Sequence, residues 1–206
     1  MLSLHEQSTL ATLCREGDLK FVKRMLQDYD NIIIAWERAW SDNPILAACA
    51  GGNIEIVELL ESKGLVLDHY EDIISAAASG GHVRMINYLL QRNLRVCNHL
   101  EGPLMHSIVH GHLQAVKYFV SHGADIHARY DEPFVQAAIN NRLEIVKYLI
   151  QKGSRFWHRT ESFQLFSPDV KSFLKRLEEC LWRNGINSYH LESNQIESNQ
   201  IVLTFD

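Results

Sequence analysis

One sequence pattern occurs five times along the chain, and this internal repetition restricts the possible folds more than any other feature. Four copies align without a gap and begin at Gly52, Gly81, Gly111 and Asn141, and a looser copy begins at Gly17. The successive starts are 35, 29, 30 and 30 residues apart. A unit of this length cannot bury its apolar face alone, so the copies are expected to stack and to share a continuous core.

Apolar residues stand two, five and eight positions after each start, and these offsets place side chains on one face of a helix. The three columns are Leu19, Ile54, Val83, Leu113 and Leu143, then Val22, Val57, Ile86, Val116 and Val146, then Met25, Leu60, Leu89, Phe119 and Leu149. The opposite face is charged, with Glu55, Glu58, Arg84, Lys117, Glu144 and Lys147. Each copy therefore predicts an amphipathic helix of about three turns.

The predicted helix ends where a glycine or asparagine stands, twelve residues after four of the starts. These residues are Gly64, Asn93, Gly123 and Gly153. Both residue types tolerate the left-handed conformation that commonly terminates a helix.

A second, shorter helix is predicted before each start. Pro44, Pro103 and Pro133 each lie eight residues upstream of a start, and proline suits the first turn of a helix because its missing N–H costs nothing there. Small residues follow, as in Ala47–Ala50 and Ala76–Ala78. Small side chains let two helices approach closely, as an antiparallel pair requires.

Residues 103–126 give the pattern in its fullest form, with Pro103, then Gly111-His112, and finally Gly123-Ala124-Asp125-Ile126. This pattern resembles the ankyrin repeat, and the resemblance extends over about residues 4–156. It implies an all-α ankyrin-repeat solenoid of about five helix pairs. Ankyrin copies usually have ~33 residues, whereas a tetratricopeptide copy has ~34 residues with tyrosine and proline elsewhere. The short copies further resemble the ankyrin arrays of giant amoeba-infecting viruses.

The expected organisation is an array over residues 1–156, with copies at 4–30, 41–67, 70–96, 100–126 and 130–156. A C-terminal capping region over 157–183 is predicted next, with Ser167 as helix cap and Pro168 in the first turn. Residues 184–206 contain Glu-Ser-Asn-Gln-Ile twice in tandem, and this polar tail is expected to be flexible. A short docking peptide is the alternative for the tail.

The composition restricts the environment and the partners. The formal net charge is -5, which gives no reason to expect nucleic acid. No basic region with a long apolar run follows Met1, and no stretch approaches the ~18 apolar residues of a membrane span. Cys14 and Cys49 fall within apolar helical patterns, which predicts small buried hydrophobes in a reducing compartment. A cytoplasmic monomer is expected, in a host cell if the chain is viral.

Eleven histidines raise the question of a metal site. His106 and His110 are four residues apart on a predicted helix, a spacing that can place two imidazoles on one face. However, His112 and His82 occupy the Gly-His position of the repeat, where the resemblance implies that the side chain ties the turn together. No glutamate lies between His106 and His110, as a His-Glu-x-x-His metalloprotease would require. No metal and no cofactor are therefore expected.

The predicted function is binding of an as yet unidentified protein partner. The sequence contains no phosphate-binding glycine loop of the P-loop or dinucleotide kind and no Gly-x-Ser-x-Gly nucleophile motif, so no enzyme is expected. In a stack of this kind the resemblance implies binding on the concave face and the turn tips, near 67–72, 98–101 and 127–132. The alternative is an adaptor whose segment 154–206 recruits a second factor, such as a ubiquitin-ligase component.

Six side chains are candidates for partner binding because tyrosine, tryptophan and arginine are favoured hot-spot residues. They are Tyr70, His99, Arg129, Tyr130, Trp36 and Trp40. For the two tyrosines the alternative is packing of one turn against the next, and for the two tryptophans it is cover over the core of an extended first helix pair.

Overall fold

The computed structural model describes residues 4–27, 43–65, 70–92, 100–154 and 163–183. Over these ranges the chain forms eleven α-helices and no β-strand. None of these helices combines the length and the apolar character needed to cross a membrane. The expected all-α fold is thereby confirmed.

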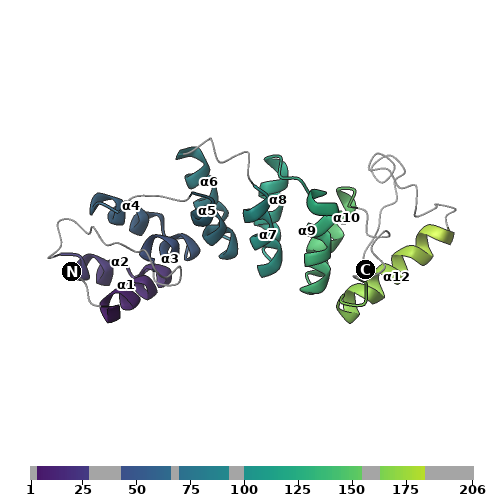
Figure 1. Cartoon of the computed structure of the whole chain (residues 1–206), viewed down its shortest axis with the longest axis horizontal. Helices are drawn as coiled ribbons and strands as arrows, with labels where there is room; N and C mark the ends of the chain where they lie inside the picture. The colour runs from purple at the N-terminus through teal and green to yellow at the C-terminus, as the bar shows by residue number, and fades with distance from the viewer. Residues whose placement is uncertain (1–3, 28–42, 66–69, 93–99, 155–162, 184–206) are drawn as a thin grey trace. The chain divides into compact units, whose positions relative to one another are not determined.

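The helices of the described ranges form five consecutive pairs, followed by a last described helix (Figure 1). The first helices of the pairs are α1 (Leu4–Glu16), α3 (Pro44–Ala50), α5 (Tyr70–Ser79), α7 (Glu101–His110) and α9 (Ala128–Ile139). The second helices are α2 (Leu19–Met25), α4 (Ile54–Ser62), α6 (Val83–Arg92), α8 (Leu113–Ser121) and α10 (Leu143–Gln151). The last described helix is α12 (Pro168–Arg183).

The chain divides into two compact units, Met1–Ala124 and Asp125–Asp206. In the first unit the first helices of neighbouring pairs pack on one another, α1 on α3, α3 on α5 and α5 on α7. The second helices form another layer, with contacts of α2 with α4 and of α6 with α8 (Figure 1). In neighbouring pairs the first helix therefore contacts the first helix and the second contacts the second, as expected for stacked copies.

Two of the three predicted apolar columns form the core of the second helices: the second column is fully buried, and so is the third except at Met25, whereas the first column is only half-buried. Val22, Val57, Ile86, Val116 and Val146 are all fully buried. The small residues of the first helices are buried too, including Ala47, Ala48, Ala77 and Ala78. The predicted burial of Cys14 and Cys49 is confirmed, since both are buried free thiols of the first helices.

Left-handed glycines end the second helices at the predicted positions. Gly64, Gly123 and Gly153 have φ values of 91°, 92° and 96°. At the exit of α8, the N–H of Ala124 donates to the carbonyl of Phe119 and the N–H of Gly123 donates to that of Val120. This pair of hydrogen bonds is a Schellman motif. Asn93 lies outside the described residues.

In two copies the residue after the starting glycine ties its pair to the preceding one. The side chain of Asn53 donates to the carbonyl of Cys14 at 2.8 Å, and Nε2 of His112 donates to that of Ser79 at 2.7 Å. Each of these side chains lies over the starting glycine of the preceding copy: a Cβ built on Gly81 would lie 2.5 Å from Nδ1 of His112. The predicted structural role of the Gly-His position is confirmed for His112.

We expect replacement of His112 with alanine to lower the free energy of unfolding by about 1–3 kcal/mol, because it removes the donor to the partly buried Ser79 carbonyl. Urea denaturation would measure this loss. Replacement with asparagine is the matched control, since Asn53 makes the equivalent bond one pair earlier in the stack. An alanine variant as stable as the wild type would contradict the role given to this side chain.

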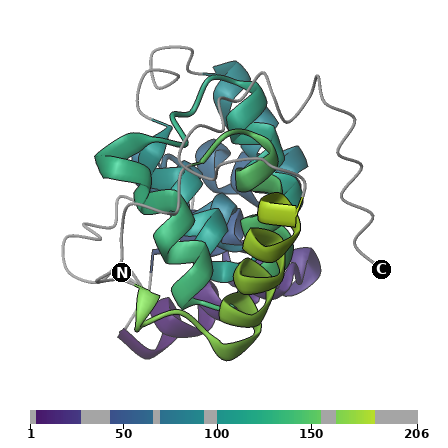
Figure 2. The ribbon, with the colours of Figure 1, turned by 90° about the vertical axis from the view of Figure 1, so that its right-hand side faces the viewer.

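In the second unit, α12 packs against α10 and caps the fifth pair (Figures 1 and 2). Ser167 begins the helix as predicted: its carbonyl accepts from the N–H of Lys171, and its hydroxyl, which lies 3.4 Å from the N–H of Val170, donates to Asn141 at 2.7 Å. The N–H of Ser167 also donates to the carbonyl of Ala138 at the end of α9. The apolar face of α12, including Phe173, is buried.

Candidate interaction surface

The tip before the regular part of α9 presents two of the predicted binding residues next to each other. Arg129, Tyr130 and Asp131 all have left-handed backbones, with φ values of 50°, 62° and 59°. A non-glycine residue in this region is uncommon and costs of order 1–3 kcal/mol when strained. Tyr130 is 86% exposed, so its ring stands clear of the unit to which it belongs.

Polar contacts hold this tip in place. Oδ1 of Asp131 lies 2.6 Å from Nδ1 of His127, and the N–H of His127 donates to Oδ1 of Asp125 at 2.8 Å. The backbone N–H of Asp131 also donates to the carbonyl of His127. These bonds close the turn on both sides of Tyr130, so the ring is presented from a defined backbone rather than from an open loop.

The other predicted binding residues cannot be assigned to this surface. Tyr70 is the first residue of α5, and its side chain is not among those described. His99, Trp36 and Trp40 lie outside the described residues.

The sequence pattern did not single out three exposed apolar side chains of the second unit. Leu165 is 66% exposed and Phe163 is 42% exposed, just before α12 begins, and Ile139 is exposed at the end of α9. Phe166, between them and α12, is buried against Phe134 with ring centroids 6.0 Å apart. Leu165 and Phe163 lie before the apolar residues that recur at helical spacing in α12. Their position outside that pattern is the sequence signal that could have indicated their exposure.

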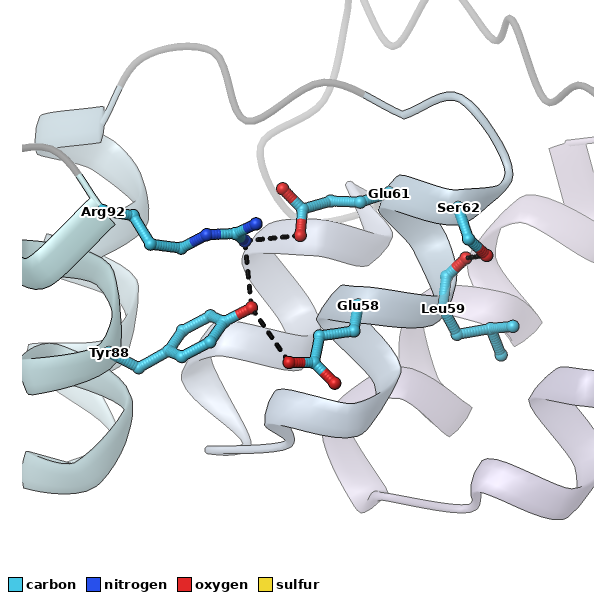
Figure 3. Close-up of polar contacts among 6 residues, drawn as sticks. All are labelled: Glu58, Leu59, Glu61, Ser62, Tyr88 and Arg92. Atoms are coloured by element: carbon cyan, nitrogen blue, oxygen red, sulfur yellow. Dashed lines mark hydrogen bonds and ion pairs between the residues drawn. The ribbon is translucent and has the colours of Figure 1, made fainter.

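The second helices of the first unit carry a polar network between neighbouring copies (Figure 3). Arg92 of α6 pairs with Glu61 of α4 at 2.5 Å and donates to the hydroxyl of Tyr88 at 2.9 Å. Tyr88 in turn donates to Glu58 at 3.4 Å. Partial burial is the main reason that the pKa of Tyr88 is raised. Both acids are half-exposed or exposed, so the network aligns α4 with α6 and contributes little stability.

The same register recurs one copy later. The hydroxyl of Tyr118 in α8 donates to the side-chain oxygen of Asn87 in α6 at 2.9 Å. Tyr88 and Tyr118 both stand seven residues after a starting glycine, and Glu58 and Asn87 both stand six after the preceding one. Tyr88 and Tyr118 therefore connect neighbouring copies. This structural role explains why tyrosine recurs at this position, and no ligand is needed to explain it.

Three histidine rings form a nearly parallel row at the end of α7. The centroids of His106 and His110 are 6.4 Å apart with an interplanar angle of 11°, and those of His110 and His112 are 6.4 Å apart with an angle of 3°. Among the described residues, no group of three or more His, Cys, Asp or Glu could hold a metal ion.

The buried thiols of Cys14 and Cys49 are poor candidates for a reactive nucleophile. Burial raises the pKa of Cys14 to about 12, and burial together with the negative charge of Glu61 raises the pKa of Cys49 to about 12. A thiol reacts as its thiolate, so the raised pKa disfavours the reactive form of both groups near neutral pH.

Comparison with known proteins agrees with this geometry. Residues 73–160 match a family model of ankyrin repeats in three copies. The chain has the ankyrin-repeat fold. It is similar to the crystal structure of the human ASB11 ankyrin repeat domain, with a TM-score of 0.61 and 21% identity over 85% of each chain. No curated protein sequence matches. Ankyrin repeats in general bind proteins on surfaces that the stacked copies provide.

Proposed function

We propose that this ankyrin-repeat chain is a non-catalytic module that binds a partner protein through its turn tips and the exposed faces of its first helices. The observation that carries the proposal is the tip at Arg129 and Tyr130. A tyrosine contributes a large rigid contact area, and an arginine beside it supplies directed donors. The tip is closed by His127 and Asp131, so less ordering entropy is lost on binding.

The test is a double variant, Arg129→Ala with Tyr130→Ala. Proximity labelling in cells with the wild type and with this variant would identify the proteins that depend on the tip. Binding of the identified protein to purified chains would then be measured by calorimetry. We expect the variant to lose about 2 kcal/mol or more of binding free energy, with an unchanged melting temperature, because Tyr130 packs little within its own unit.

The matched control replaces two exposed residues at the end of α10, Gln151→Ala with Lys152→Ala. Equal affinity of the control and the wild type is expected. Equal affinity of the tip variant and the wild type would reject the tip as the binding site. A melting temperature that falls with the affinity would assign the tip a structural role instead.

A second candidate is an adaptor whose C-terminal segment recruits another factor, such as a ubiquitin-ligase component. Exposed Phe163 and Leu165 before α12 favour it, since exposed apolar clusters commonly mark contact sites. Replacing both with serine should remove one set of labelled proteins and leave the set that depends on Tyr130 unchanged. Deletion of 184–206 separately tests the tail. If neither change alters the labelled proteins, the adaptor role is rejected.

The location is also a proposal. The buried free thiols suit a reducing compartment, so we propose the cytoplasm, that of a host cell if the short copies have a viral origin. A tagged chain imaged in intact cells would test this, and localisation to a secretory compartment would overturn it.

A further inference from the structure

The first helix pair leaves uncovered a position that every later pair of its unit buries. The fourth residue after the starting glycine is Phe21 in α2, which is 52% exposed, whereas its equivalents Ile56, Met85 and Ala115 are at most 1% exposed. Because α2 contacts α4 of the following pair, a side chain directed toward that pair would be covered. The position therefore faces the side of a preceding pair, and no helix precedes α1 among the described residues.

Two half-buried apolar residues extend this uncovered surface, Leu13 of α1 and Met25 of α2. Their equivalents in the three later pairs of the unit are fully buried, namely Ala48, Ala77 and Ser107 for Leu13 and Leu60, Leu89 and Phe119 for Met25. We call Leu13, Phe21 and Met25 the open end face. An exposed apolar surface with a polar rim commonly marks a site of protein contact.

The charges that flank Phe21 along α2 are complementary to themselves. Asp18 stands three residues before Phe21 and Arg24 three residues after it, so both neighbour the ring on the helix surface. Oδ1 of Asp18 accepts from the backbone N–H of Phe21 at 3.1 Å. Arg24 is exposed and forms no ion pair within the described part of the chain. When a second α2 lies antiparallel over the first and is centred on Phe21, each Asp18 faces the Arg24 of the other helix.

We propose that two copies of this chain associate through the open end face, with their α2 helices antiparallel across a two-fold axis beside Phe21. A two-fold contact uses the same patch on both partners, so the patch must be complementary to itself. The two Phe21 rings supply its apolar centre, and two pairs of Asp18 with Arg24 fix the antiparallel direction. The proposal replaces the monomer expected from the sequence. It is independent of the proposed function, because the tip at Arg129 and Tyr130 belongs to the second unit.

The charges around the open end face favour a second copy over an extended polyanion. Lys20 and Lys23 of α2 are exposed and would attract a nucleic acid or an anionic membrane surface. However, the exposed Glu16 and the half-buried Asp18 stand at the start of the same helix and would repel it. A second copy brings Arg24 to Asp18 instead, so the carboxylate gains a partner.

The experiment is sedimentation equilibrium of the full chain over a wide range of concentrations at low salt. We expect the wild type to form a dimer as the concentration rises, and added salt to weaken it because the ion pairs are screened. Phe21→Ala should weaken the association by more than about tenfold. Thermal melting should show that this variant keeps its fold, because the ring lies largely outside the core of its own chain.

Charge reversal tests the antiparallel arrangement. Arg24→Asp places two carboxylates opposite each other and Asp18→Lys places two cations opposite each other, so each variant alone should associate about tenfold more weakly or worse. An equimolar mixture of the two should associate as the wild type does, because each carboxylate of one chain then faces a cation of the other. Asp18→Lys also removes the cap of α2. Arg24→Asp leaves that cap in place and tests the pairing by itself.

The matched control is Lys23→Asp, which makes the same change of charge two residues from Phe21, on another side of the helix. It should associate as tightly as the wild type. The proposal is overturned if the wild type stays monomeric at every concentration, if Phe21→Ala associates equally tightly, or if Lys23→Asp weakens association as much as Arg24→Asp. A monomer that sediments with anionic lipid vesicles would assign α2 to a membrane surface instead.

Discussion

Replacement of Phe119 with alanine is expected to lower the free energy of unfolding by about 3–5 kcal/mol. Phe119 is fully buried at the third apolar column of α8, in the first unit. The change removes most of the ring and leaves a cavity that helices fixed on both sides cannot fill. Urea denaturation followed by circular dichroism would measure the loss from the midpoint at an unchanged slope.

The control is Phe21→Ala in α2, because Phe21 is 52% exposed and leaves no cavity. We expect a loss below about 1 kcal/mol for this variant. Similar losses for Phe119→Ala and Phe21→Ala would mean that the third column of α8 is not core. The assignment of α8 to the stack would then fail with it.

Replacement of Gly80 with alanine is expected to cost about 1–3 kcal/mol through overpacking. A Cβ built on Gly80 would lie 2.1 Å from the carbonyl oxygen of Ala50, which is backbone and cannot rotate away. Gly51 stands in the same relation to the carbonyl of Arg15, so the close approach is a property of the stack. Thermal and urea denaturation would both report the loss.

Gly102→Ala provides a control of opposite sign. The nearest atom to a Cβ at Gly102 is the carboxylate oxygen of Glu71 at 2.9 Å, at the end of a flexible side chain. Since Gly102 lies in α7, alanine should leave stability unchanged or raise it by about 0.4–1 kcal/mol. If Gly102→Ala were destabilised and Gly80→Ala were as stable as the wild type, the packing described for these first helices would be contradicted.

The helices and their pairing could be predicted from the sequence because they depend on features that recur along it. The columns at Val57 and Leu60, the proline at Pro44 and the glycine at Gly64 each specify a local conformation that the stack then reinforces. The Ser167-Pro168 start of α12 is local in the same way. In all these cases residues close in sequence determine the backbone conformation. A single sequence is therefore enough to predict these helices and their ends.

The candidate binding surface was less predictable because it depends on contacts that the repeat does not encode. The left-handed backbone of Arg129 and Tyr130 opposes their own preferences and is fixed by the pairing of His127 with Asp131. The features that distinguish one copy of the stack from another depend on such non-repeating contacts.

The contact of Asn53, His82 and His112 with the starting glycine of the preceding copy has a consequence for how such a chain can change in evolution. Asn53 and His112 satisfy the same requirement with different side chains, and each reaches only its immediate neighbour. A duplicated copy inserted after one that starts with glycine would therefore carry its own turn residue, and that residue would meet the glycine of the copy before it. Length can vary by whole copies without redesign of the rest, whereas insertion of a few residues inside a copy would break the register.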